Sequence, residues 1–150
     1  MYDRPALEEL LAAVGIFLEK QIGPLVKDDP KLYYQTLIAY NLLKIAEREL
    51  VWSDKHIHTQ WERLNNLLEI DMPLPTNALE AREALERRNE QLCERIRTGE
   101  HDEQWPRTVL FAHLLATTRE QLEVANPKFL QVISQERATR ELSTGILGGG

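Results

Sequence analysis

The sequence predicts an all-α protein, an antiparallel bundle of about five or six helices packed around one central buried helix. Three observations predict it. Apolar residues recur at three- and four-residue spacing along most of the chain. No segment shows the alternation typical of a strand, and no internal repeat occurs. Capping residues and prolines stand together where the periodic segments begin or end, as in Asp29-Pro30 and Asn126-Pro127.

The first two helices follow from these signals. Asp3 can cap a first helix, whose apolar stripe extends to Ile22 and ends at Gly23-Pro24. Asp29-Pro30 begins a second helix that runs to about Trp52. Because the second helix is apolar over most of its circumference, we expect it to be the central one.

Ser53 or Asp54 can cap a third helix. Its predicted stripe consists of Ile57, Trp61, Leu64 and Leu68. Residues 71–76 hold two prolines and form a connector. A charged fourth helix follows from Thr76 or Asn77 to Gly99, with Leu85, Leu92 and Ile96 inside.

After a polar loop at residues 100–104, a fifth helix is predicted from Pro106 to Ala125. Its predicted stripe consists of Phe111, Leu115, Thr118 and Leu122. A shorter sixth helix covers residues 128–142. We expect one helical domain over residues 1–142 and a disordered, glycine-rich tail at 143–150.

Composition narrows the class of protein. The 150 residues are 43% hydrophobic and 28% charged, which is ordinary for a globular domain. A net charge of −6 argues against a nucleic-acid partner, because phosphate binding needs a concentrated basic face. The N-terminus lacks a signal-peptide pattern, no apolar run could cross a bilayer, and Cys93 is the only cysteine. We therefore expect a cytoplasmic protein that does not bind membranes.

Glu49 is the most informative single residue. On a helical wheel it falls within a broad apolar arc. The members of this arc are Ile38, Ala39, Leu42, Leu43, Ile45, Ala46 and Leu50. Asn41 and Arg48 lie at the edge of this arc. A carboxylate in a core face is costly unless a cation or hydrogen-bond donors meet it. We favour a structural role, in which Glu49 forms an ion pair that fixes helix packing. The alternative is a functional role, in which its carboxylate binds a ligand or acts as an acid or base. Possible cationic partners on other helices are Arg63, Arg97 and Arg119.

The remaining reactive side chains do not form a recognisable site. His56 and His58 are two residues apart and lack the Glu-x-x-His spacing of di-iron bundles, so we predict neither a metal nor another cofactor. Cys93 lies beside the core face of its helix, where a cysteine usually packs as a small hydrophobe. His113 sits away from the predicted stripe of the fifth helix and could face a second layer or a cleft.

Three patterns resemble a bacterial family known only as domain of unknown function 6285. They are Asn41-x-Leu43-x-Ile45-x-x-Arg48-Glu49-Leu50, Leu92-Cys93-x-x-Ile96-Arg97-x-Gly99, and His113-Leu114-x-x-Thr117-Thr118-x-x-x-Leu122-x-x-x-Asn126-Pro127. Members of this family are often encoded near, or joined to, aminoglycoside-phosphotransferase-like and acyl-CoA dehydrogenase-like proteins. The resemblance implies a small helical protein that works beside a larger enzyme. It places Asn41, Arg48, Glu49, Arg97, His113 and Asn126 in the family's motif positions.

Two functions from different classes are therefore open. The first is a non-catalytic accessory or interaction domain that binds a phosphotransferase-like or acyl-CoA-metabolising enzyme. The alternative is a small-molecule-binding domain or weak enzyme, with Glu49, Arg97 and His113 meeting in a polar pocket between helices. A homodimer that buries Tyr33, Leu37 and Tyr40 against a twofold mate is a further possibility.

Overall fold

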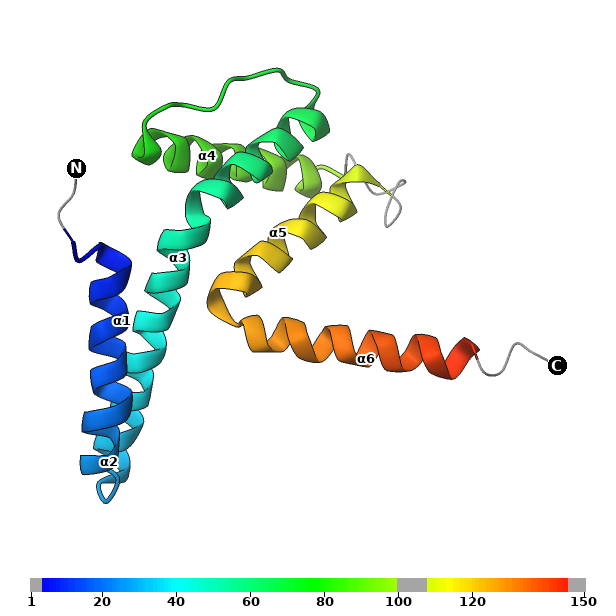
Figure 1. Ribbon diagram of the computed structural model, residues 1–150. Coiled ribbons are helices and arrows are strands. Elements are labelled where there is room, and N and C mark those ends of the chain that lie inside the picture. The colour runs from blue at the N-terminus through cyan, green and yellow to red at the C-terminus, as the bar shows by residue number, and fades with distance from the viewer. Residues whose placement is uncertain (1–3, 100–107, 146–150) are drawn as a thin grey trace. The chain divides into compact units, whose positions relative to one another are not determined.

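The chain folds entirely into helices and connecting turns. The computed structural model describes residues 4–99 and 108–145, and no strand occurs within these ranges (Figure 1). The predicted all-α class is therefore confirmed. Contacts within the chain divide it into two compact units, Met1–Ser53 and Asp54–Gly150. Each unit is described by itself.

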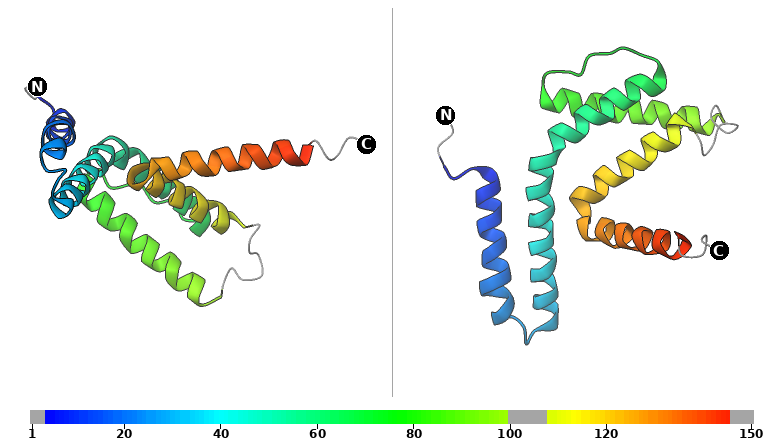
Figure 2. Two further views of the ribbon diagram at one scale, coloured as in Figure 1. Left: turned by 90° about the horizontal axis from the view of Figure 1, so that it is seen from below. Right: turned by 45° about the vertical axis from the view of Figure 1, so that its right-hand side comes forward.

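The first unit is a helical hairpin. It contains α1 (Leu7–Phe17), the π-helical turn η1 (Leu18–Ile22), α2 (Gly23–Leu25) and the first part of α3 (Pro30–Leu68). Both views that show the hairpin from the side place α1 along α3 (Figures 1 and 2). Asp29 caps α3 as predicted, because its Oδ1 accepts hydrogen bonds from the backbone N–H groups of Lys31 and Leu32, both at 3.0 Å. The predicted Asp3 cap lies outside the described residues.

The two helices of the hairpin meet through small and aromatic residues. Gly15 of α1 is buried, and a Cβ atom at this position would lie 3.7 Å from the Tyr40 ring of α3. Thr36, one turn before Tyr40, is also buried, and its hydroxyl donates to the carbonyl oxygen of Leu32 at 2.9 Å. The face of α3 that contains Thr36 and Tyr40 is therefore the one covered by α1.

The face of α3 predicted to be the core is only partly covered. Its partly buried members are Ala39, Leu43, Ile45 and Ala46. Ile38 and Leu42 are 42% and 60% exposed, and Leu50 is exposed as well. The expectation of a central buried face over Asn41–Leu50 was wrong for these side chains. Its physical reason is that this helix is apolar on two sides, and a helical wheel cannot tell which side another helix covers.

The second unit contains a conventional apolar core. It is built from the last part of α3, α4 (Ala78–Arg97), α5 (Val109–Ala125) and α6 (Pro127–Gly145). Its buried cluster consists of Trp61, Leu64, Leu85, Leu92 and Leu110, with Ile57 and Leu68 packed against it. The predicted stripes of the third and fourth helices are confirmed except for Ile96, which is exposed.

The helix ends agree partly with the sequence. The Asn77 Oδ1 accepts from the N–H groups of Leu79 and Glu80, and Gly99 adopts a φ of 78° just after α4, so both predicted ends of that helix are confirmed. The predicted break at Ser53-Asp54 was wrong, since α3 is continuous there. Serine and aspartate favour caps, but neither removes a backbone donor as proline does.

The last two helices also differ in their bounds. Thr108 caps α5, whose predicted start at Pro106 lies outside the described residues, as does the predicted loop at 100–104. α6 begins at Pro127 and extends to Gly145, three residues into the segment predicted as a tail.

Candidate functional site

The helix α5 buries a different face from the one predicted. Phe111 and Leu115, two members of the predicted stripe, are exposed, whereas Leu110 and Val124 are buried. His113 lies on this buried face and is only 2% exposed. The predicted stripe was wrong at Phe111 and Leu115 because α5 carries apolar side chains on two sides, and a helical wheel cannot tell which side is covered. The face that α5 buries is partly polar, and it faces polar side chains of α3.

A partly buried ion pair connects these two helices. Arg63 of α3 donates from Nη1 and Nη2 to the two carboxylate oxygens of Glu120 on α5, at 2.8 and 2.7 Å. The Thr59 hydroxyl donates to the same carboxylate at 3.1 Å, and Arg63 Nη2 also lies 3.4 Å from the Thr117 hydroxyl. Such a bidentate arrangement is the strongest geometry for an arginine–carboxylate pair. We call these four residues together with His113 the polar layer.

Two opposing effects act on the pKa of Glu120 in this layer. Burial by itself raises the pKa of this carboxyl group. The hydrogen bonds and positive charge of Arg63, with the hydroxyl of Thr59, outweigh burial and lower the pKa below its usual value. Glu120 is therefore ionised, and its charge is neutralised within the fold.

His113 contributes a neutral ring to the same layer. Burial, followed by the positive charge of Arg63, lowers the pKa of His113, while the charge of Glu120 opposes them. Its Nδ1 atom and the Nε atom of Arg63 are buried and have no hydrogen-bond partner among the described residues. A buried neutral imidazole is the form that burial favours, since charging it in this place would cost free energy.

The contacts between α3 and α5 continue one turn further along both helices. His56 Nε2 lies 3.1 Å from the Glu123 carboxylate, and the His56 side chain is mostly buried. His56, Thr59 and Arg63 thus follow one face of α3 at three- and four-residue spacing, opposite Thr117, Glu120 and Glu123 on α5. The sequence suggested Arg63 only as a possible partner of Glu49, and its pairing with Glu120 was not predicted.

A second buried cation lies between α3 and α4. The Arg88 guanidinium is 4.3 Å from the centroid of the Trp61 ring and donates to the Asn65 side-chain oxygen at 2.8 Å. Arg88 is only 5% exposed, and burial lowers its pKa. The Trp61 indole N–H and the Asn65 amide both donate to the carbonyl oxygen of Met72, at 2.7 and 2.9 Å. These bonds fix the connector after α3. Arg88 was not predicted to be buried, although it stands between Leu85 and Leu92 on the core face.

The six residues predicted as a polar cluster lie in different surroundings. Within the first unit, Asn41 and Glu49 are exposed and Arg48 is partly buried. The expectation that Glu49 is a buried carboxylate was therefore wrong, because its face of α3 is the exposed one.

The other three predicted residues belong to the second unit. Arg97 is exposed and pairs with Glu94 on its own helix at 3.1 Å, whereas His113 is buried. Asn126 caps α6, since its Oδ1 accepts from the Phe129 N–H at 3.3 Å. Of these six, only His113 lies in the polar layer.

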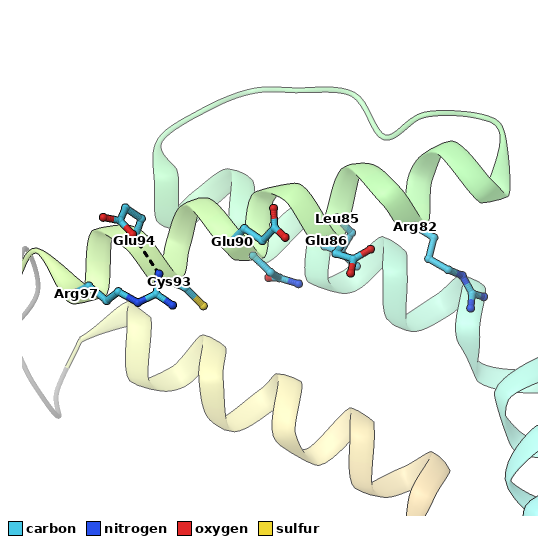
Figure 3. Close-up of a pocket in the computed structure, with 8 residues that line it drawn as sticks. Arg82, Leu85, Glu86, Glu90, Cys93, Glu94 and Arg97 are labelled. Carbon is cyan, nitrogen blue, oxygen red and sulfur yellow. Dashed lines mark hydrogen bonds and ion pairs between the residues drawn. The ribbon is translucent and has the colours of Figure 1, made fainter.

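A groove follows the exposed side of α4 (Figure 3). Its volume is about 730 Å³, and Cys93, which is exposed rather than packed in the core, lies along it. Arg82 lies at one end and the Arg97–Glu94 pair at the other, with the carboxylates of Glu86 and Glu90 between them. Within the described residues, no group of three histidine, cysteine, aspartate or glutamate side chains is placed to hold a metal ion.

The fold and its polar layer define an all-α protein whose second unit combines a small leucine–tryptophan core with a buried ion pair. The chain belongs to the family of domain of unknown function DUF6285, whose model matches residues 27–129. The match includes all of α3, α4 and α5, and so the whole polar layer. No curated protein and no solved structure matches the chain. None of the helices described is both long and apolar enough to cross a membrane.

Proposed function

We propose that this protein is a helical accessory domain of the bacterial cytoplasm that binds a larger enzyme, of the phosphotransferase-like or acyl-CoA-metabolising class. One observation carries the proposal. Leu7, Leu10, Val14 and Phe17 of α1 form an apolar stripe, and each is between 48% and 57% exposed. We call these four residues the α1 stripe.

The α1 stripe has the spacing that protein partners recognise. Its members are separated by three, four and three residues, so they lie on one face of the helix. Amphipathic helices that dock into a groove of another protein use anchors at this spacing. Leu11 of the same helix and Leu18 at the start of η1 lie on the neighbouring face and are already partly buried. The stripe therefore remains available after the hairpin has formed.

Burial of the α1 stripe against a partner protein would be energetically favourable. Burying the remaining half of each leucine, valine or phenylalanine would contribute about 1 kcal/mol per side chain. Contiguous apolar patches of this kind on soluble proteins commonly mark interaction sites. The class of enzyme is suggested by the family resemblance, since family members are often encoded beside such enzymes.

Binding to the neighbouring enzymes tests this proposal. The full chain is titrated into a purified phosphotransferase-like or acyl-CoA dehydrogenase-like protein encoded beside it, and binding is measured by calorimetry. We expect Leu10→Asp or Phe17→Asp to weaken binding at least about tenfold, because a desolvated carboxylate would face the groove. Ile16→Asp places the same charge on an exposed position of α1 that projects about 140° from the middle of the stripe, and it should bind as the wild type does.

Two results would overturn the proposal. One is the absence of binding to both classes of enzyme. The other is equal binding by the stripe variants and the Ile16→Asp control, with circular dichroism showing that all of them are folded.

A further inference from the structure

We infer that the exposed face of α3 in the first unit pairs with the same face of a second copy of this chain, as an antiparallel twofold helix pair. The face is defined by Lys31, Ile38, Leu42 and Glu49, and we call it the α3 face. All four side chains are exposed. The inference is independent of the proposed function, which depends on the α1 stripe.

The α3 face lies opposite the side covered by α1. At 100° per residue, Tyr40 projects about 180° from the middle of the α3 face. Tyr40 packs toward Gly15 of α1. A second copy can therefore approach the α3 face without displacing α1. The same contact turns Tyr40 away from the dimer face, so this interface differs from the one that the sequence suggested through Tyr33, Leu37 and Tyr40.

The order of residues along the α3 face is symmetric. Lys31 and Glu49 are 18 residues apart, which is five helical turns, so they project in the same direction. Ile38 and Leu42 lie between them, seven residues from Lys31 and from Glu49 respectively. The face therefore reads cation, apolar, apolar, anion, with equal spacing from both ends.

This order is complementary to itself when a second copy runs in the opposite direction. An antiparallel pair centred at position 40 places Lys31 of each copy opposite Glu49 of the other. Within one copy, these two residues lie about 27 Å apart along the helix, so the two ion pairs form at opposite ends of the interface. The same register places Ile38 of each copy opposite Leu42 of the other. Both ion pairs and both apolar contacts arise from a single twofold axis, as an isologous interface requires.

A parallel arrangement would lose this complementarity. Lys31 would then face Lys31 and Glu49 would face Glu49, and like charges placed opposite each other are destabilising. The charges thus specify the direction of the partner helix, while Ile38 and Leu42 supply the apolar contact. Two short helical faces form a small interface, so a dissociation constant on the order of micromolar is expected.

Charge-swap variants of the full chain test the register directly. Sedimentation velocity over a range of concentrations measures self-association. We expect Glu49→Lys alone, or Lys31→Glu alone, to raise the dissociation constant at least about tenfold, because each creates two like-charge contacts. The double variant Lys31→Glu/Glu49→Lys restores both ion pairs and should associate as the wild type does.

A mixing experiment separates this register from a general effect of charge. In an equimolar mixture of the Glu49→Lys and Lys31→Glu variants, every Lys faces a Glu across the two copies, so the mixture should form a heterodimer although each variant alone is monomeric. Glu62→Lys makes the same substitution at an exposed position of α3 outside the face and should leave association unchanged.

The inference would be overturned by a wild-type chain that sediments as a monomer at every concentration, which would mean that another protein or another segment covers the face. It would also be overturned if the double variant or the mixture failed to associate while circular dichroism showed folded protein. Leu10→Asp in the α1 stripe should leave the dimer intact, so failure of one proposal can be told from failure of the other.

Discussion

Arg63 of α3 and Glu120 of α5 are joined by two nearly equal hydrogen bonds, 2.8 and 2.7 Å long, in a partly buried setting. The residues are far apart in the sequence, so the pair fixes the alignment of two helices that no short connection holds together. Hydrogen bonds to Thr59 and Thr117 restrict both side chains further. Leucine contacts alone would tolerate small shifts of one helix along the other, whereas a bidentate pair would not.

Removal of one partner of this pair should destabilise the second unit. We expect Glu120→Gln to lower the free energy of unfolding by about 1–3 kcal/mol, because the partly buried Arg63 charge loses its counter-charge. Replacing both residues, as in Arg63→Met/Glu120→Leu, should restore much of that loss. Urea denaturation followed by circular dichroism measures both effects.

The exposed pair between Arg87 and Glu83 provides a matched control. Its atoms lie 3.8 Å apart on one helix, and both side chains are more than half exposed. Arg87→Met should change stability by less than about 0.5 kcal/mol. A Glu120→Gln variant as stable as this control would show that the buried pair contributes nothing to stability.

Acid should destabilise the second unit in two steps. The pKa of His113 is lowered in the folded state, so the unfolded chain binds more protons below its ordinary pKa of about 6.5. Stability is therefore complete above pH 6.5 and is lost as the pH falls from there toward the folded pKa of His113. The pKa of Glu120 is also lowered, so its contribution is present above about pH 4.5 and is lost as the pH falls further.

Denaturation at a series of pH values measures this dependence. In His113→Leu the first step, just below pH 6.5, should disappear, while the step due to Glu120 remains. His58→Leu removes a mostly exposed histidine and should leave the first step in place. An unchanged pH profile in His113→Leu would contradict the assignment.

The contact between Arg88 and Trp61 leads to a prediction about the core. Arg88→Met retains much of the volume but removes the cation over the ring and the donor to Asn65. Arg88→Lys keeps the charge but not the planar guanidinium. We expect Arg88→Lys to be destabilised by about 1–3 kcal/mol, since a smaller, more strongly hydrated cation would be buried there. Arg88→Met should be the more stable of the two, and thermal unfolding measured by circular dichroism would reveal the reverse order.

The sequence predicted the helical class, the caps at Asp29 and Asn77, and the core residues Trp61 and Leu64, because each depends on local chemistry or on one clear stripe. It did not predict which side of a two-sided helix is covered, so Glu49 was placed in a core that lies elsewhere. The polar layer was not predicted for a related reason. Arg63 and Glu120 face inward only when two helices that are distant in the sequence pack together. Of the predicted site residues, only His113 was expected to face a second layer or a cleft, because it lies on a different side of its helix from the predicted apolar stripe.

Gly15 offers a prediction about the first unit. Glycine inside a helix is less favourable than alanine because it loses more conformational freedom on folding. A Cβ atom at Gly15 would meet the Tyr40 ring at 3.7 Å, an ordinary van der Waals contact. We therefore expect Gly15→Ala to raise stability by about 0.5–1 kcal/mol. Gly23→Ala should gain less, because its Cβ would lie 3.4 Å from the Leu18 carbonyl oxygen. Thermal unfolding compares the two, and a Gly15→Ala variant less stable than the wild type would show that α1 and α3 pack more closely than this distance allows.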